Sequence, residues 1–148
     1  MNPLLFDSSW RLSSQVIRLN KRDAEPMIRS HYLSQWPNNV MLTMGLKCKR
    51  DFVGVITYSI PHKKLQDRFG IETWELSRLW INDSIPKNAE TFLIGRSIRY
   101  IKKEHINLKT LISFADPEHG HSGVIYKASN WIQDEHESKN LFYYPLNK

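Results

Sequence analysis

The chain has 148 residues, of which 41% are hydrophobic and 24% charged, a composition that fits a folded domain and excludes a disordered or fibrous protein. No apolar run approaches the roughly 20 residues that cross a bilayer, and Cys48 is the only cysteine, which disfavours a disulfide-stabilised secreted protein. We therefore expect one cytoplasmic domain over residues 1–148. The net charge of +6 suits a polyanionic partner, and a basic surface that only keeps the protein soluble is the alternative.

The first predicted elements are a helix and a hairpin. Apolar residues at helical spacing predict a helix over residues 25–36, with Pro26 in its first turn and Pro37 directly after its end. The β-like runs 40–46 and 52–60 are separated by a short polar segment, so they predict a hairpin. Residues 61–69 follow as a basic loop.

The second half alternates strands and helices. Residues 73–81 predict a strand, and strict alternation would place Trp74, Leu76, Arg78 and Trp80 on one face. The remaining elements are predicted as a helix over 89–103, a strand over 110–115, a helix over 122–128 and a strand over 141–144. This order predicts an α/β fold with a mixed central sheet flanked by helices, whose site lies at the carboxyl ends of strands.

Two charged residues on these strands are candidates for chemistry. Arg78 offers a planar set of donors that suits a carboxylate or phosphate, whereas its structural alternative is an ion pair with Glu75 or Asp116. Asp116 follows a buried strand and suits a general base or a metal ligand. Its alternative is a carboxylate that caps a turn.

A second group of candidates comes just after Asp116. His119 and His121 titrate near neutral pH, but His-x-His in a loop is a weak metal motif. Ser122 and Gly123 start a predicted helix and suit an anion, and Tyr126 lies one turn further on. Core packing is the common alternative for Tyr126, as it is for His31 in the first predicted helix.

Taken together, three segments resemble a known family. They are residues 74–81 (WELSRLWI), residues 114–116 (FAD) and the run 120–131. In order and spacing they resemble the Mom family of bacteriophage DNA-modification proteins, which are relatives of the GNAT acyltransferases. The resemblance covers residues 31–131 and implies a GNAT-like fold.

The resemblance also implies an activity. Mom proteins convert the N6 amino group of adenine in DNA to a carbamoylmethyl (acetamido-type) adduct that protects phage DNA from host restriction. The implied partner is double-stranded DNA with a flipped adenine, since N6 is stacked and paired in B-DNA. The implied location is the cytoplasm of the bacterial host, and no membrane is involved.

The family's functional positions match residues named above. The resemblance implies catalytic roles for His31, Tyr32, Arg78, Asp116 and Tyr126, and iron held by His31, Tyr32 and Asp116. It implies an acyl-CoA or another acyl or aminoacyl donor, for which the candidate contacts are Arg78, Asn88, Thr91, Ser122 and Gly123. The segment 86–92 (PKNAETF) departs from the glycine-rich turn with which GNAT enzymes bind coenzyme A.

Contacts to DNA phosphates are expected from Lys63, Lys64 and Arg68, with a solvated face as the alternative. Two other functions remain open. One is a GNAT-like N-acyltransferase that uses acyl-CoA on a small amine or protein. The other is a basic nucleic-acid-binding domain that keeps the transferase fold without its chemistry.

Overall fold

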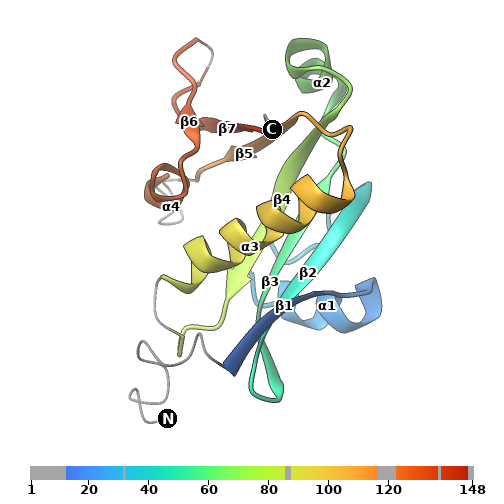
Figure 1. Ribbon diagram of the computed structural model, residues 1–148, viewed down its shortest axis with the longest axis vertical. Helices are drawn as coiled ribbons and strands as arrows, with labels where there is room; N and C mark the ends of the chain where they lie inside the picture. The colour runs from blue at the N-terminus through green and yellow to red at the C-terminus, as the bar shows by residue number, and fades with distance from the viewer. Residues whose placement is uncertain (1–12, 32, 86–87, 117–122, 137, 147–148) are drawn as a thin grey trace.

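A computed structural model describes residues 13–31, 33–85, 88–116, 123–136 and 138–146. Within these ranges the chain forms a seven-stranded sheet and four helices (Figure 1). The strands are β1 (Ser14–Arg18), β2 (Val40–Cys48), β3 (Asp51–Ser59), β4 (Thr73–Ile81), β5 (Thr110–Phe114), β6 (Ile132–Gln133) and β7 (Leu141–Pro145). The helices are α1 (Lys21–Ile28), α2 (Lys63–Phe69), α3 (Ala89–Glu104) and α4 (Val124–Ala128).

The spatial order of the strands is β1-β2-β3-β4-β5-β7-β6. β4 and β5 run parallel, because α3 crosses over between them, and the other neighbouring pairs are antiparallel. The sheet is therefore mixed and flanked by helices, which confirms the predicted fold class.

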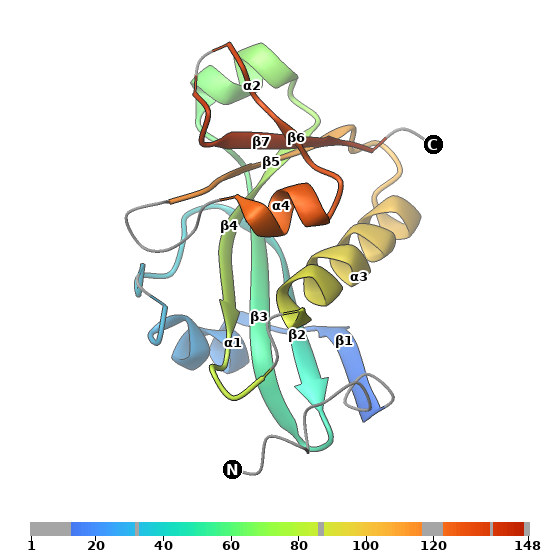
Figure 2. The ribbon, with the colours of Figure 1, turned by 90° about the vertical axis from the view of Figure 1, so that its left-hand side faces the viewer.

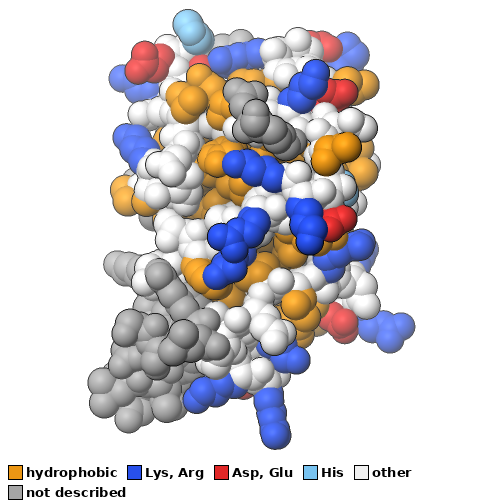
Figure 3. Space-filling model, in the orientation of Figure 1, with side chains coloured by type: hydrophobic (Ala, Val, Ile, Leu, Met, Phe, Trp, Pro, Cys, Tyr) orange, Lys and Arg blue, Asp and Glu red, His pale blue; other side chains and the backbone are white. Residues whose placement is uncertain are grey.

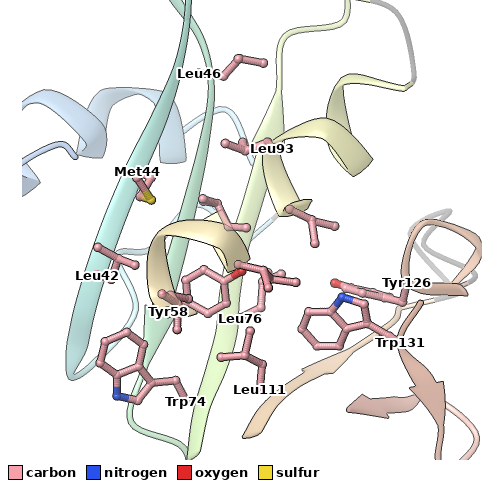
Figure 4. Packing of buried hydrophobic residues seen from close by; sticks show 14 of the residues in the cluster. Leu42, Met44, Leu46, Tyr58, Trp74, Leu76, Leu93, Leu111, Tyr126 and Trp131 are labelled. Carbon is pink, nitrogen blue, oxygen red and sulfur yellow. The ribbon is translucent and has the colours of Figure 1, made fainter. Parts of the chain in front are cut away.

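Helices α1 and α3 cover opposite faces of the sheet (Figure 2). On the α3 face, alternate residues of β2 join one large core: Leu42, Met44 and Leu46 pack with Leu93 of α3 (Figure 4). On the α1 face, Ala24 and Ile28 pack with Val55 of β3 in a smaller core. We call these two sides the α3 face and the α1 face.

Several predicted elements are confirmed closely. β2 and β3 form the predicted hairpin, β4 spans the predicted residues, and α3 extends the predicted helix by a single residue. β5, α4 and β7 also lie where they are expected. β1 and the short β6 are not predicted, because neither has a strong alternation of apolar and polar residues.

The predicted position of the first helix is wrong. α1 begins at Lys21, because the side chain of Asn20 accepts a hydrogen bond from the backbone N–H of Asp23 (2.9 Å) and caps the helix. It ends at Ile28, so Pro26 is inside the helix and not in its first turn. The predicted basic loop is also wrong, since residues 63–69 form α2 with His62 as its cap.

The predicted faces of β4 are only half right. Trp74 and Leu76 point into the core on the α3 face, but Trp80 packs against the smaller core on the α1 face. The cause is a β-bulge: Tyr58 pairs with Leu76 while Thr57 pairs with Arg78, so Ser77 is the extra residue. From this bulge onward the alternation of β4 is reversed.

The bulge also marks where β4 and β5 separate. Their pairing covers Thr73, Trp74 and Glu75, opposite Thr110, Leu111 and Ile112. Beyond Glu75 the two strands diverge, and β5 continues to pair with β7 through Phe114. The sheet therefore opens where the paired parts of these two parallel strands end, in the middle of β4 and near the carboxyl end of β5.

A buried ion pair ties α2 to the last hairpin. Arg68 donates two hydrogen bonds to Asp134, at 2.6 and 3.1 Å, and the Asp134 side chain is only 1% exposed. The same carboxylate accepts the backbone N–H groups of His136 and Ser138. This pair therefore fixes the turn between β6 and β7.

The surface of the α3 face is basic. Lys and Arg side chains lie across the middle of this face in Figure 3, where α3 contributes Arg96, Arg99, Lys102 and Lys103. No helix in the described ranges is long and apolar enough to span a membrane.

We predict that Arg68→Met lowers the free energy of unfolding by about 2–3 kcal/mol, because it leaves the Asp134 carboxylate buried without its cation. Urea denaturation measures this change. Lys63→Met is the control: it removes an exposed ion pair with Asp67 (3.3 Å) and should change stability by less than about 0.5 kcal/mol. Equal effects of the two substitutions would contradict a structural role for the Arg68–Asp134 pair.

Candidate active site

A cavity of about 650 Å³ lies where β4 and β5 separate. It is lined by residues 75–78 of β4, residues 114–116 at the end of β5, Leu33, and the turn residues Ser138 and Asn140. We call it the main pocket. A cleft at the carboxyl ends of parallel strands is where open α/β sheets bind their ligands, as the sequence predicted.

Glu75 is the acidic group of β4 in this pocket. Trp74 and Leu76 on either side point to the α3 face, so alternation turns Glu75 to the α1 face. Burial raises the pKa of the Glu75 carboxyl, and the nearby Arg78 cation opposes part of that rise. A carboxylate with a raised pKa beside a cleft is well suited to accept a proton.

Hydroxyl groups form a polar layer beside Glu75. The side chain of the bulge residue Ser77 bonds to Thr57 Oγ1 (2.8 Å) and Ser59 Oγ (2.7 Å). Thr57 and Ser59 are both buried on β3. These bonds satisfy the polar groups that the bulge brings to the pocket floor and hold its shape.

Arg78 fastens the loop that follows α1. Its Nε donates to the carbonyl oxygens of Leu33 (3.0 Å) and Gln35 (3.1 Å), and its Nη2 donates to Gln35 O (2.9 Å). Its Nη1 donates to Ser77 O (2.7 Å). Arg78 therefore shapes the pocket through backbone carbonyls, a role that sequence reasoning did not anticipate.

Asp116 and His31 line two neighbouring cavities. Asp116 is half-buried and lines the main pocket. His31 lines a narrow second cavity of about 40 Å³ together with Arg78 and Tyr126. The two cavities share residues 76–78 and Phe114, so they meet at the bulge.

Tyr126 reaches the narrow cavity from α4. Its phenol oxygen bonds to Ser113 Oγ on β5 (2.7 Å), and its ring stacks on Phe142 with centroids 5.4 Å apart. Figure 4 shows Tyr126 beside Trp131 in the core. Tyr126 is therefore packed in the core, as the alternative interpretation predicted, and it also lines the narrow cavity. Its catalytic role stays a prediction.

The proposed donor contacts are spread along the chain. Asn88 and Thr91 lie at the start of α3, where Thr91 Oγ1 donates to Asn88 O (3.0 Å). Gly123 precedes α4 with φ of 87° and packs against the Phe142 ring, which explains why a glycine stands there. Tyr32, His119, His121 and Ser122 fall outside the described residues.

The expected iron site has no support in the described residues, which contain no group of three or more His, Cys, Asp or Glu able to hold a metal. His31 Nδ1 accepts the backbone N–H of Leu33 (2.9 Å), so this nitrogen is already engaged. His31 and Asp116 also line different cavities. Tyr32, the third expected ligand, lies outside the described residues, so the described part of the chain gives the iron site no support.

The expected DNA contacts differ in their surroundings. Lys64 is exposed, and Lys63 is exposed with a weak surface pair to Asp67. Arg68 is held by the buried Asp134, so its main role is structural. Lys63 and Lys64 remain candidates for phosphate contacts.

The pocket residues that sequence reasoning missed include Glu75, Phe114 and Asn140. The sequence suggests Glu75 only as a partner for Arg78, although its place between two apolar core residues already turns it to the other face. Phe114 has the pattern of a residue that ends a buried strand. Asn140 has no signal in sequence, because a turn brings it to the pocket from far along the chain.

Comparisons of the sequence with known proteins identify the family of this chain. The model of the Mom protein family matches residues 13–147. The methylcarbamoylase Mom of Escherichia phage Mu is 33% identical over 115 residues, which cover 73% of this chain and 48% of that protein. The chain thus spans about half the length of this curated relative.

Solved structures show the same fold. AtaTR bound with AcCoA superposes with a TM-score of 0.65 at 16% identity, over 90% of this chain and 94% of that one. Spermidine N-acetyltransferase from Vibrio cholerae gives a TM-score of 0.65 at 12% identity, over 91% and 95% of the two chains. The fold is therefore that of the GNAT acyltransferases, and the chain belongs to the Mom protein family.

Proposed function

We propose that this protein is a DNA-modifying transferase that attaches a carbamoylmethyl group to the N6 amino group of adenine. The observation that carries this proposal is the main pocket of a Mom-family protein, with Glu75, Arg78 and Asp116 around a cleft between diverging strands. The phage Mu relative, named as a methylcarbamoylase, supports the same reaction. In the host cytoplasm such a modification would protect phage DNA from restriction.

The amino group of adenine needs help to react, because its lone pair is delocalised into the ring. In the proposed step this lone pair bonds to an electrophilic carbon of the donor. The bond from that carbon to its leaving group breaks, and the electron pair stays on the leaving group. The base that accepts the proton lost by N6 is Glu75, since it is desolvated and faces the main pocket.

The other side chains have supporting roles. Tyr126 supplies a proton to the leaving group through the narrow cavity, where its hydroxyl is positioned by Ser113. Asp116 lines the same pocket and helps to position the base within it. Arg78 keeps the loop of residues 33–35 against the pocket, and His31 lines the cavity that leads to Tyr126.

Two observations bear on the donor. The AcCoA in the AtaTR structure supports an acyl-CoA-type donor. The first turn of α3 favours another carrier, because Glu90 places negative charge at the helix end where a pyrophosphate would bind. Transfer from an acyl-CoA would join N6 to a carbonyl carbon and give an N6-acyl adenine instead.

The alternative function is N-acyl transfer from acyl-CoA to a small amine or protein, which the likeness to spermidine N-acetyltransferase favours. The two functions differ in their product. One alters the nucleosides of cellular DNA, and the other leaves them unchanged while the protein binds acetyl-CoA.

DNA would approach from the α1 face, onto which the main pocket opens. Helix α2 stands at one side of this pocket, because Arg68 holds Asp134 and Asp134 in turn holds the pocket residue Ser138. Lys63 and Lys64 on α2 are therefore well placed to contact phosphates next to a base that has entered the pocket.

Expression of the chain in bacteria should yield a deoxyadenosine heavier by one carbamoylmethyl group less one hydrogen, measured by mass spectrometry of cellular nucleosides. Glu75→Gln and Asp116→Asn should each lower its yield, by about 100-fold or more for the proposed base Glu75. Glu72→Gln is the matched control, since this acid lies just before β4 and pairs with Lys109 on the surface. Unmodified DNA with folded wild-type protein that binds acetyl-CoA would favour the alternative.

The raised pKa of Glu75 predicts a gain in stability on its removal. A carboxyl whose pKa is raised by folding stabilises the protein below its unfolded pKa, and this contribution is lost as the pH rises through the folded pKa. Glu75→Gln should therefore unfold at a higher urea concentration than wild type at neutral pH. The difference should vanish in acid, where Glu75 is protonated; a loss of stability at neutral pH would contradict the burial of this charge.

Salt dependence of DNA binding tests the role of α2. The double substitution Lys63→Gln and Lys64→Gln should reduce the slope of log K against log salt by about 0.9 for each phosphate that the protein no longer neutralises. Arg96→Gln with Arg99→Gln removes the same charge from the opposite face of the sheet and should leave the slope unchanged (Figure 3). The reverse result would place DNA on the α3 face.

A further inference from the structure

The rim of the main pocket carries a large exposed aromatic side chain. Phe114 is 44% exposed although it ends a buried strand, and it lines both the main pocket and the narrow cavity. Its neighbour Ser113 bonds to Tyr126 on the α3 face, so alternation turns Phe114 to the α1 face beside Glu75. Core packing does not account for this side chain, whose ring presents an apolar surface to a polar cleft.

A second apolar side chain stands on the same pocket wall. Leu33 is also 44% exposed and belongs to the loop that Arg78 holds through the Leu33 carbonyl. The pocket therefore combines two exposed apolar side chains with the carboxylates of Glu75 and Asp116. This combination suits a flat, apolar ring that carries polar groups on its edge.

An amide side chain completes the pocket. The backbone of Asn140 is fixed by two hydrogen bonds, one from Ala115 N–H to its carbonyl (2.8 Å) and one from its own N–H to Ser138 Oγ (3.2 Å). Its side-chain amide makes no hydrogen bond within the described part of the chain and lines the pocket. A carboxamide offers one donor and one acceptor, which match the amino group and ring nitrogen on an edge of adenine.

We propose that Phe114 and Asn140 form the adenine-recognition subsite, in which Phe114 stacks on the extrahelical base and Asn140 bonds to its edge. The inference rests on the proposed function and names the residues that select its substrate. The N6 group carries two hydrogens, so one can be donated to the Asn140 carbonyl while Glu75 accepts the other. Stacking on Phe114 replaces part of the stacking that the base loses on leaving the duplex.

The test compares two duplexes in binding measured by fluorescence anisotropy, one fully paired and one with an adenine opposite an abasic site. The second duplex has already lost the pairing of this adenine. Wild-type protein should bind it more tightly, and Phe114→Ala should reduce this preference on the order of 10-fold. Phe114→Tyr keeps a stacking ring and should keep the preference.

Ile132→Ala is the matched control, because Ile132 is also 44% exposed but lies on β6 outside the pocket. It should bind both duplexes as wild type does. Thermal unfolding of each variant establishes that the fold is retained. A Phe114→Ala protein with the wild-type preference, or a wild-type protein with none, would overturn the stacking role.

Asn140 is tested by replacing the unpaired adenine with hypoxanthine, which presents an oxygen where adenine has its amino group. Wild-type protein should prefer adenine, and Asn140→Leu should weaken this discrimination while keeping the preference for the abasic duplex, because the contact of N6 with Glu75 is retained. Equal discrimination by wild type and Asn140→Leu would remove Asn140 from the subsite.

The nucleoside mass spectrum separates this inference from the proposed function. Modified deoxyadenosine from wild type, with a reduced yield from Phe114→Ala, supports both. An unchanged yield from Phe114→Ala overturns the subsite and leaves the function standing. Absence of the modified nucleoside from cells with folded wild-type protein overturns the function itself.

Discussion

The divergence of β4 and β5 is the constraint on which the rest of the site depends. One extra residue, Ser77, shifts the register of β4 against β3 and reverses the alternation that follows. Pairing of β4 with β5 stops at Glu75, so the sheet opens between these two strands beyond that residue. The bulge also places the hydroxyl group of Ser77 inside the fold, where it bonds to the hydroxyls of Thr57 and Ser59.

The opening between β4 and β5 places the Glu75 side chain in a partly buried position, where its negative charge is poorly solvated. Glu75 faces a pocket in which burial raises its pKa, and the Arg78 cation offsets only part of this effect. The same desolvation that makes Glu75 a stronger base therefore weakens the folded state at neutral pH. Carboxyl groups with raised pKa values are typical of active sites, and the raised pKa distinguishes Glu75 from the surface acids of the described chain.

Two arginines hold the walls of the pocket by different means. Arg78 binds the carbonyl groups of the loop after α1, whereas Arg68 binds the buried carboxylate of Asp134 and through it the turn before β7. Both are planar donors with fixed geometry, which suits them to fasten irregular backbone. Loops that lack regular hydrogen bonds of their own are thereby kept in place around a cleft, and they supply Leu33, Ser138 and Asn140.

The sequence by itself determined the order of the longer strands and helices from residue 40 onward, apart from α2 and the short β6, and with it the mixed sheet and the family, because periodicity and motif spacing are local properties of the chain. It also identified Arg78, Asp116 and Tyr126, which lie around the cleft. Only the tertiary structure decided the bulge at Ser77, the pairing of Arg68 with Asp134 and the meeting of Glu75, Phe114 and Asn140. These features depend on register and on contacts between residues far apart in the chain, which local patterns do not encode.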